Sequence, residues 1–188
     1  LLWFANECDE KIEYTMESDS SGNRTMKGII ELNAILTADI DVSSVSWNSI
    51  GFSDYVDYDE YSSVLKKVNF EGIFDGNGYT IHGMNIANTA ALGDGMFTLI
   101  GENGVVKNLH LEAFAEGKIG FGAIAYENYG VISNCHVTGE LFGQKVVGGI
   151  VGYNSRKVLT RIVIASSEYE IHIKIGVVGT LHLRSRKV

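Results

Sequence analysis

The sequence contains no proline and only two cysteines among its 188 residues. The absence of proline excludes collagen-like and polyproline segments. Cys8 and Cys135 lie far apart, so they make neither a disulfide framework nor the closely spaced ligand pairs of a zinc site. No run approaches 18 consecutive apolar residues, and we therefore expect no membrane insertion. Packing must stabilise this fold.

Basic residues are also scarce. Fifteen Lys and Arg stand against 23 Asp and Glu, which gives a net charge of −8. A negative field of this size repels nucleic acid and anionic lipid, so we expect neither as a partner. By contrast, glycine is abundant, at 22 residues, and indicates many tight turns.

Glycine, asparagine and apolar residues recur at a fixed spacing in the second half of the chain. Residues 108–111 (NLHL) align with residues 134–137 (NCHV), and Asn128 aligns with Asn154. Within each repeat the apolar residues alternate, which predicts short strands joined by tight turns. Parallel strands normally need a helical crossover, yet no helix fits inside these repeats. A coil in which each strand pairs with the equivalent strand of the next repeat needs no helical crossover. We therefore expect an all-β, right-handed parallel β-helix with about 26 residues per coil.

We expect a single domain over residues 1–188. Residues 1–28 form an N-terminal cap and lead-in, because apolar residues at its start follow a helical stripe that would bury Trp3 or Phe4 over the first open coil. Residues 29–160 form the coils, interrupted by an insertion at 52–68. Residues 161–188 depart from the repeat and form a degenerate or atypical C-terminal segment.

Several segments resemble the GLUG-motif repeat proteins of bacterial surfaces. The matching blocks are WFAN at residues 3–6, NAILTADID at 33–41, WNSIG at 47–51, FEGIFDGNGYTIHGMNI at 70–86 and VGGIVGYN at 147–154. The resemblance covers about residues 1–160, and Arg156 departs from it where the family often has Gly. It implies a secreted or cell-surface location and a non-catalytic, adhesin-like binding role within a larger repeat protein.

Two alternatives to this function stay open. One is a carbohydrate-active β-helix enzyme, either a polysaccharide lyase or a glycoside hydrolase. The other is a structural stalk attached to a surface peptidase. For the enzyme, Glu102 and Glu127 align at equivalent positions of successive repeats, with one residue inserted near Tyr129. Stacked carboxylates about 5 Å apart would suit a retaining glycosidase, although the next coil places Tyr153 at this position.

One acidic and aromatic segment, DYVDYDEY at residues 54–61, is too polar for a coil. Its residues could stack on sugars or chelate calcium, and loops on a rigid scaffold often carry binding. We therefore predict a ligand-binding site for a glycan or a surface protein here, on a monomeric chain, made by Asp54, Tyr55, Asp57, Tyr58, Asp59 and Tyr61. Apart from calcium we expect no cofactor, and we expect no dedicated metal site.

The remaining patterns favour structural roles. The DGNG run at residues 75–78 predicts a tight turn. Asn108 with Asn134, and Asn103 with Asn128 and Asn154, predict ladders of side-chain amides between coils. His110 and His136 should stack as an outward-facing pair with Asn85 as the preceding member, which supplies too few ligands for a metal.

Overall fold

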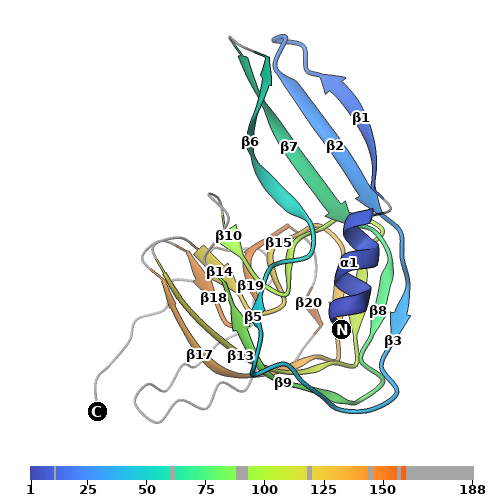
Figure 1. Cartoon of the computed structure of the whole chain (residues 1–188), viewed down its shortest axis with the longest axis vertical. Coiled ribbons are helices and arrows are strands. Elements are labelled where there is room, and N and C mark those ends of the chain that lie inside the picture. Colours follow the sequence, from blue (N-terminus) through green and yellow to red (C-terminus); the bar gives the residue numbers. More distant parts are fainter. Residues whose placement is uncertain are drawn as a thin grey trace.

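The computed structural model describes residues 1–10, 12–59, 62–87, 93–117, 120–143, 146–155 and 158–159. These residues are mostly β-strand, with one short helix at the N-terminus (Figure 1). The expected all-β composition and the expected N-terminal helix are therefore confirmed. Residues 161–188 and Arg156, for which the sequence predicted a departure from the repeat, lie outside the described residues.

The elements follow one another along the chain as a helix and a series of short strands. They are α1 (Leu2–Glu10), β1 (Glu13–Ser18), β2 (Arg24–Ile30), β3 (Ala34–Ile35), β4 (Ile40–Asp41), β5 (Ser46–Trp47), β6 (Phe52–Asp59), β7 (Ser62–Phe70), β8 (Ile73–Asp75), β9 (Thr80–Ile86), β10 (Gly93–Asp94), β11 (Phe97–Ile100), β12 (Val105–Lys107), β13 (His110–Gly117), β14 (Gly120–Gly122), β15 (Ala125–Asn128), β16 (Val131–Ser133), β17 (His136–Gly143), β18 (Val147–Gly148), β19 (Val151–Asn154) and β20 (Val158–Leu159).

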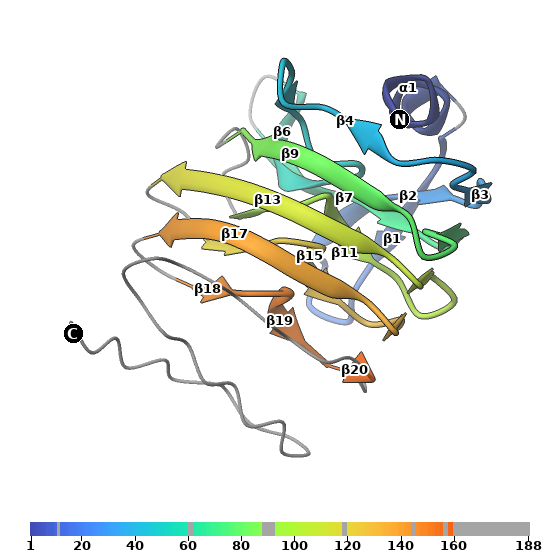
Figure 2. The same cartoon turned by 90° about the horizontal axis from the view of Figure 1, so that it is seen from below.

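The strands form four sheets. One has the order β1-β2-β7-β11-β15-β19, with β6 also paired to β7. The others are β10-β14-β18, then β20-β16-β12-β8-β3, and β17-β13-β9-β4 with β5 also paired to β9. Among these pairs only β1–β2 and β6–β7 are antiparallel. Every other pairing is parallel. Figure 2 shows the parallel strands β9, β13 and β17 stacked on one another.

Parallel pairing at the predicted spacing is confirmed for most of the second half. Val105 pairs with Val131 and His110 with His136, which is the offset that the repeat predicts. The offset is larger by two positions between β11 and β15, where Phe97 pairs with Ala125. Residues 101–104 therefore form a turn two residues longer than residues 129–130. The sequence alignment placed one inserted residue near Tyr129, and this prediction was wrong. The extra residues lie in the earlier repeat, at residues 101–104.

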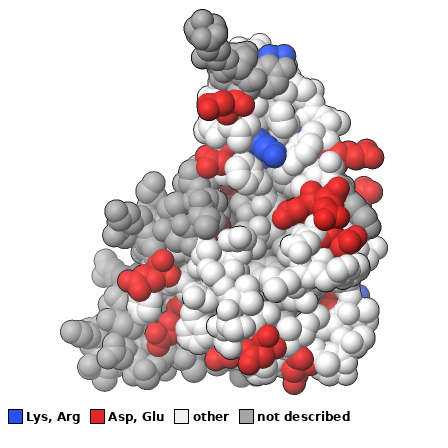
Figure 3. Space-filling model, in the orientation of Figure 1, with Lys and Arg blue, Asp and Glu red and all other residues white. Residues whose placement is uncertain are grey.

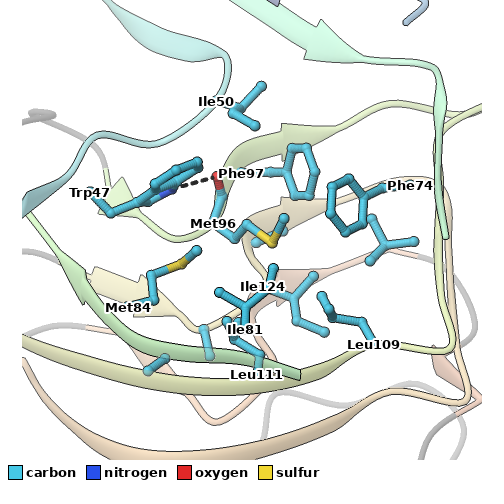
Figure 4. Close-up of a cluster of buried hydrophobic side chains, with 14 of the residues drawn as sticks. Trp47, Ile50, Phe74, Ile81, Met84, Met96, Phe97, Leu109, Leu111 and Ile124 are labelled. Carbon is cyan, nitrogen blue, oxygen red and sulfur yellow. Dashed lines mark hydrogen bonds between the residues drawn. The ribbon is translucent and has the colours of Figure 1, made fainter. Parts of the chain in front are cut away.

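Large side chains fill the space between the sheets. Trp47, Phe74, Phe97 and Phe121 are almost completely buried, and the Trp47 indole N–H donates to the carbonyl of Met96 at 3.1 Å (Figure 4). The predicted inward-facing residues Leu109, Leu111, Cys135 and Val137 all lie in this core. A core filled with side chains places any ligand on the outside.

The first helix covers one end of this core. Phe4 is 6% exposed and its ring lies 6.3 Å from that of Phe70 and 5.6 Å from that of Phe74, whereas Trp3 is 73% exposed. The sequence predicted that either Trp3 or Phe4 would be buried over the first coil, and the buried residue is Phe4. Figure 2 shows α1 at the β4 end of the stack. Within the described ranges, no helix has the length and apolarity needed to cross a membrane.

A four-stranded arm projects from this body (Figure 1). It consists of the hairpin β1–β2 and the hairpin β6–β7, joined by parallel pairing of β2 with β7. The segment expected as an insertion, residues 52–68, is thus regular strand in its described part. Beyond the arm, β7 continues into the body and pairs with β11 at Phe70 and Ile100. At the tip of the other hairpin, the Asp19 carboxylate accepts backbone N–H bonds from Ser21 and Asn23.

The helix cap can be tested with two neighbouring aromatic residues. Phe4→Ala should lower the free energy of unfolding by about 3 kcal/mol, because it leaves a cavity over Phe70 and Phe74. Trp3→Ala is the matched control and should change it by less than about 0.5 kcal/mol, since its side chain is exposed. Urea unfolding followed by tryptophan fluorescence, for which Trp47 remains as the reporter, measures both. Equal effects would show that the helix does not cap the core.

Candidate functional site

The acidic and aromatic segment predicted as a ligand site forms strand β6 in the arm. Tyr55, which is 65% exposed, and the exposed Asp57 lie two residues apart and share one face. Asp54 lies on the other face and is half-buried. The side chains of Tyr58, Asp59 and Tyr61 lie outside the described residues. Because Asp54 and Asp57 face opposite ways, these two carboxylates do not bind one cation together.

The antiparallel hairpin gives Asp54 a cationic neighbour that the sequence order does not show. Its partner across the strand pair is Lys66. The Lys66 ammonium group also lies 4.5 Å from the centroid of the Tyr14 ring and 5.5 Å from that of Phe52. In the described residues no group of three His, Cys, Asp or Glu side chains is placed to hold a metal ion.

The predicted carboxylate pair of Glu102 and Glu127 is not formed. Glu127 on β15 lies opposite Leu99 on one side and Tyr153 on the other. Glu102 lies exposed in the long turn after β11. The turn is tied to the preceding repeat, because the backbone N–H of Asn103 donates to the Glu71 carboxylate at 2.7 Å. The two extra residues of this turn move Glu102 out of register, and the geometry of a retaining glycosidase is absent from this pair.

Glu127 instead lies in a cluster with a lysine and tyrosines. Its Oε2 atom is 3.6 Å from Lys67 Nζ and accepts a hydrogen bond from the Tyr129 hydroxyl at 3.3 Å. Burial, together with the nearby Glu127 charge, raises the pKa of Tyr129. Burial also raises the pKa of Tyr126 to about 12, with Tyr153 and Glu127 adding to the effect. We call Lys67, Tyr126, Glu127, Tyr129 and Tyr153 the tyrosine–glutamate cluster.

Tyr126 fixes one wall of this cluster. Its ring lies against Gly93, Gly120 and Gly152, where an added Cβ would come closer than 3.0 Å to the ring in each case. The Tyr153 ring packs edge-on against Tyr126, with centroids 5.6 Å apart and an interplanar angle of 88°. Tyr153 is still 52% exposed. The cluster thus presents an exposed ring on a rigid support.

Sequence reasoning found part of this cluster. The placement of Tyr153 at the Glu127 position one repeat later is confirmed by the pairing of β15 with β19. Tyr126 and Lys67 were missed. Lys67 comes from the arm-forming strand β7, which carries no repeat signature that relates it to Glu127. The glycines at positions 93, 120 and 152 were a readable signal, because they leave space for a large neighbour.

The asparagine ladder is confirmed at two places. Asn134 donates to Asn108 Oδ1 at 2.8 Å, and Asn108 donates to Asp75 Oδ1 at 3.0 Å. This bond from Asn108 is the main cause that lowers the pKa of Asp75. Asn128 donates to Asn154 Oδ1 at 2.8 Å. The expected place of Asn103 in the second ladder was wrong, because Ile100 lies opposite Asn128.

The predicted tight turn at residues 75–78 and the predicted stacking of His110 on His136 are both confirmed. In the DGNG turn, Asn77 and Gly78 have φ angles of 51° and 82°, and Asp75 accepts from the backbone N–H of Asn77. His110 and His136 stack with ring centroids 5.6 Å apart. The residue that precedes them is Thr80, whereas Asn85 lies opposite Phe114, so the expected third member was wrong.

Comparison with known proteins gives two partial relatives. The chain is 34% identical over 121 residues to Halomucin of Haloquadratum walsbyi, which covers 62% of this chain and 1% of that protein. It is 32% identical over 162 residues to a protein of Evansella cellulosilytica named as a Gly-rich membrane protein, which covers 68% of this chain and 17% of that one. The chain therefore spans a small fraction of either relative. No family model and no solved structure matches it.

The ladder generates a prediction about stability. Asn134 has a φ of 50°, so Asn134→Ala loses a side-chain hydrogen bond and also strains the backbone, which should cost about 2 kcal/mol. Asn134→Gly loses only the bond and should cost about 1 kcal/mol. Asn103→Ala, outside the ladder, should have little effect. Chemical denaturation of the three variants gives these values, and equal losses for Ala and Gly would contradict the strain argument.

The arm generates a second prediction. Replacing residues 54–61 by a short Gly-Ser link should leave the body folded. It should cost about 1–2 kcal/mol, because Val56 no longer lies opposite the buried Val64. Any calcium binding of the intact chain should weaken, since the replacement removes the predicted carboxylate ligands. Calorimetric titration of both chains with calcium measures this, and equal heats would place calcium elsewhere.

Proposed function

We propose that this chain is a right-handed parallel β-helix of the GLUG-repeat type, which acts as a non-catalytic binding and display module of a secreted or cell-surface protein. The observation that carries the proposal is the parallel stacking of equivalent strands, one repeat apart, in four sheets. Such stacking makes a rigid body in which each repeat contacts its neighbours. Its outward side chains are then free to differ from repeat to repeat.

The surface and the core support a role outside the molecule. The core is filled by residues such as Phe97 and Ile124, so the interior holds side chains rather than a ligand (Figure 4). Acidic side chains dominate the charged surface on the face seen in Figure 3, in line with the net charge of −8. Such a surface favours neutral or cationic partners over polyanions.

The names of the two partial relatives support a surface location. One is a halomucin and the other is named as a membrane protein. Since this chain corresponds to a small part of each, we propose that it is one segment of a larger surface protein. A stalk that positions another domain is the second candidate, and the continuous pairing of β7, β11, β15 and β19 favours it because it stiffens the stack.

The carbohydrate-active alternative has less support. It depended on Glu102 and Glu127 as a stacked pair, and Leu99 occupies the position opposite Glu127 instead. Glu127 hydrogen-bonds Tyr129 and lies beside Lys67, an arrangement that suits ligand contact without a second carboxylate.

Surface location can be tested on intact cells of the organism that encodes the chain. Antibodies against the purified chain should label unpermeabilised cells or detect the protein in the medium, and external protease should remove the signal. A cytosolic protein of the same cells, which must survive the protease, is the control. Signal that appears only after permeabilisation would overturn the proposal.

A further inference from the structure

We propose that the tyrosine–glutamate cluster is a carbohydrate-binding site that takes a neutral pyranose unit of a glycan. The inference rests on the proposed function, which it deepens by naming a ligand and a place. The cluster lies on the outside of the sheet β7-β11-β15-β19, where the base of the arm meets the body. It differs from the arm strand β6, to which the sequence assigned the ligand.

The first support is unused hydrogen-bonding capacity. Of the two carboxylate oxygens of Glu127, Oε2 contacts Lys67 and Tyr129, and Oε1 has no hydrogen bond to the described residues. Lys67 has no polar contact there besides Glu127. A carboxylate that accepts and an ammonium that donates, side by side, match the hydroxyl groups of a sugar, each of which both donates and accepts.

Two further polar residues share the face of the sheet on which Lys67 lies. Ser53 is the partner of Lys67 across the hairpin, and Asn69 is two residues along the same strand and shares its face. Ser53 Oγ and Asn69 Oδ1 are buried without a hydrogen-bond partner among the described residues. Buried polar atoms are normally satisfied. These two buried oxygens lie outside the cluster itself, but they show that the polar groups next to Lys67 are not saturated by a structural network.

The second support is the aromatic platform. A pyranose presents an apolar face of C–H groups that packs on an aromatic ring, and the exposed Tyr153 ring is available for it. The ring of Tyr126 packs against three glycines and contacts the Tyr153 ring edge-on, which restricts the movement of Tyr153. A ring positioned before binding loses less conformational freedom when the ligand arrives. Glu127 lies directly opposite Tyr153 on the neighbouring strand, so stacking and hydrogen bonding can act on the same sugar.

The charges select a neutral ligand. Lys67 and Glu127 compensate each other at 3.6 Å, so the cluster offers no excess positive charge to a uronate. The net charge of −8 of the whole chain adds long-range repulsion against acidic polymers. A neutral hexose or pentose chain avoids both costs.

The test uses the whole chain and isothermal titration with soluble oligosaccharides. The probes are cellohexaose, xylohexaose, mannohexaose and chitohexaose, with hexagalacturonate as the anionic comparison. At least one neutral probe should bind. Tyr153→Ala should weaken that binding about tenfold or more, which corresponds to ~1.4 kcal/mol. Glu127→Gln keeps the size of the side chain and should weaken binding severalfold with the fold unchanged.

Two controls separate the cluster from the arm. Tyr55→Ala removes a comparably exposed tyrosine on β6 and should leave binding within about twofold, or ~0.4 kcal/mol. The chain with residues 54–61 replaced should also keep it. Unchanged binding by both Tyr153→Ala and Glu127→Gln, no binding of any neutral probe, or preference for hexagalacturonate would each overturn the proposal. None of these outcomes changes the result of the surface-labelling experiment. Failure of the glycan site can therefore be distinguished from failure of the proposed surface location.

Discussion

The parallel backbone pairing between equivalent strands is the interaction on which the rest of this structure depends. One repeat cannot bury enough apolar surface to fold alone, because its inward side chains offset only part of the conformational entropy lost by ordering it. Stacking supplies the missing burial and satisfies the strand edges at once. It also explains why α1 covers the β4 end, where Phe70 and Phe74 would otherwise be exposed.

The stack absorbs differences in repeat length in its turns. Between β11 and β15 the offset grows by two positions, and the common offset returns at β12 and β16 because the turn at residues 101–104 absorbs the difference. Asn108 and Asn134 hold equivalent turns with positive φ angles, and their amides bond from one repeat to the next. Regular strands with variable turns allow a surface to change while the core stays the same.

The arm and the tyrosine–glutamate cluster arise where this regularity is broken. The antiparallel hairpins extend the sheet beyond the body, and β7 belongs to both parts. Lys67 therefore approaches Glu127 from a segment with no repeat relationship to it. The junction thereby combines the ion pair of Lys67 and Glu127 with the exposed Tyr153 and its neighbour Tyr126.

The sequence by itself determined the β composition, the repeat spacing, the inward positions of Leu109, Leu111, Cys135 and Val137, and the turn at residues 75–78. These features recur as residue types at fixed intervals, so local pattern is enough to read them. Only the tertiary structure decided that Glu102 is separate from Glu127, that residues 52–68 form strands of an arm, and that Lys67 meets Glu127. The physical reason is that turn length and antiparallel pairing set the hydrogen-bond register between segments, and that register leaves no periodic trace in the sequence.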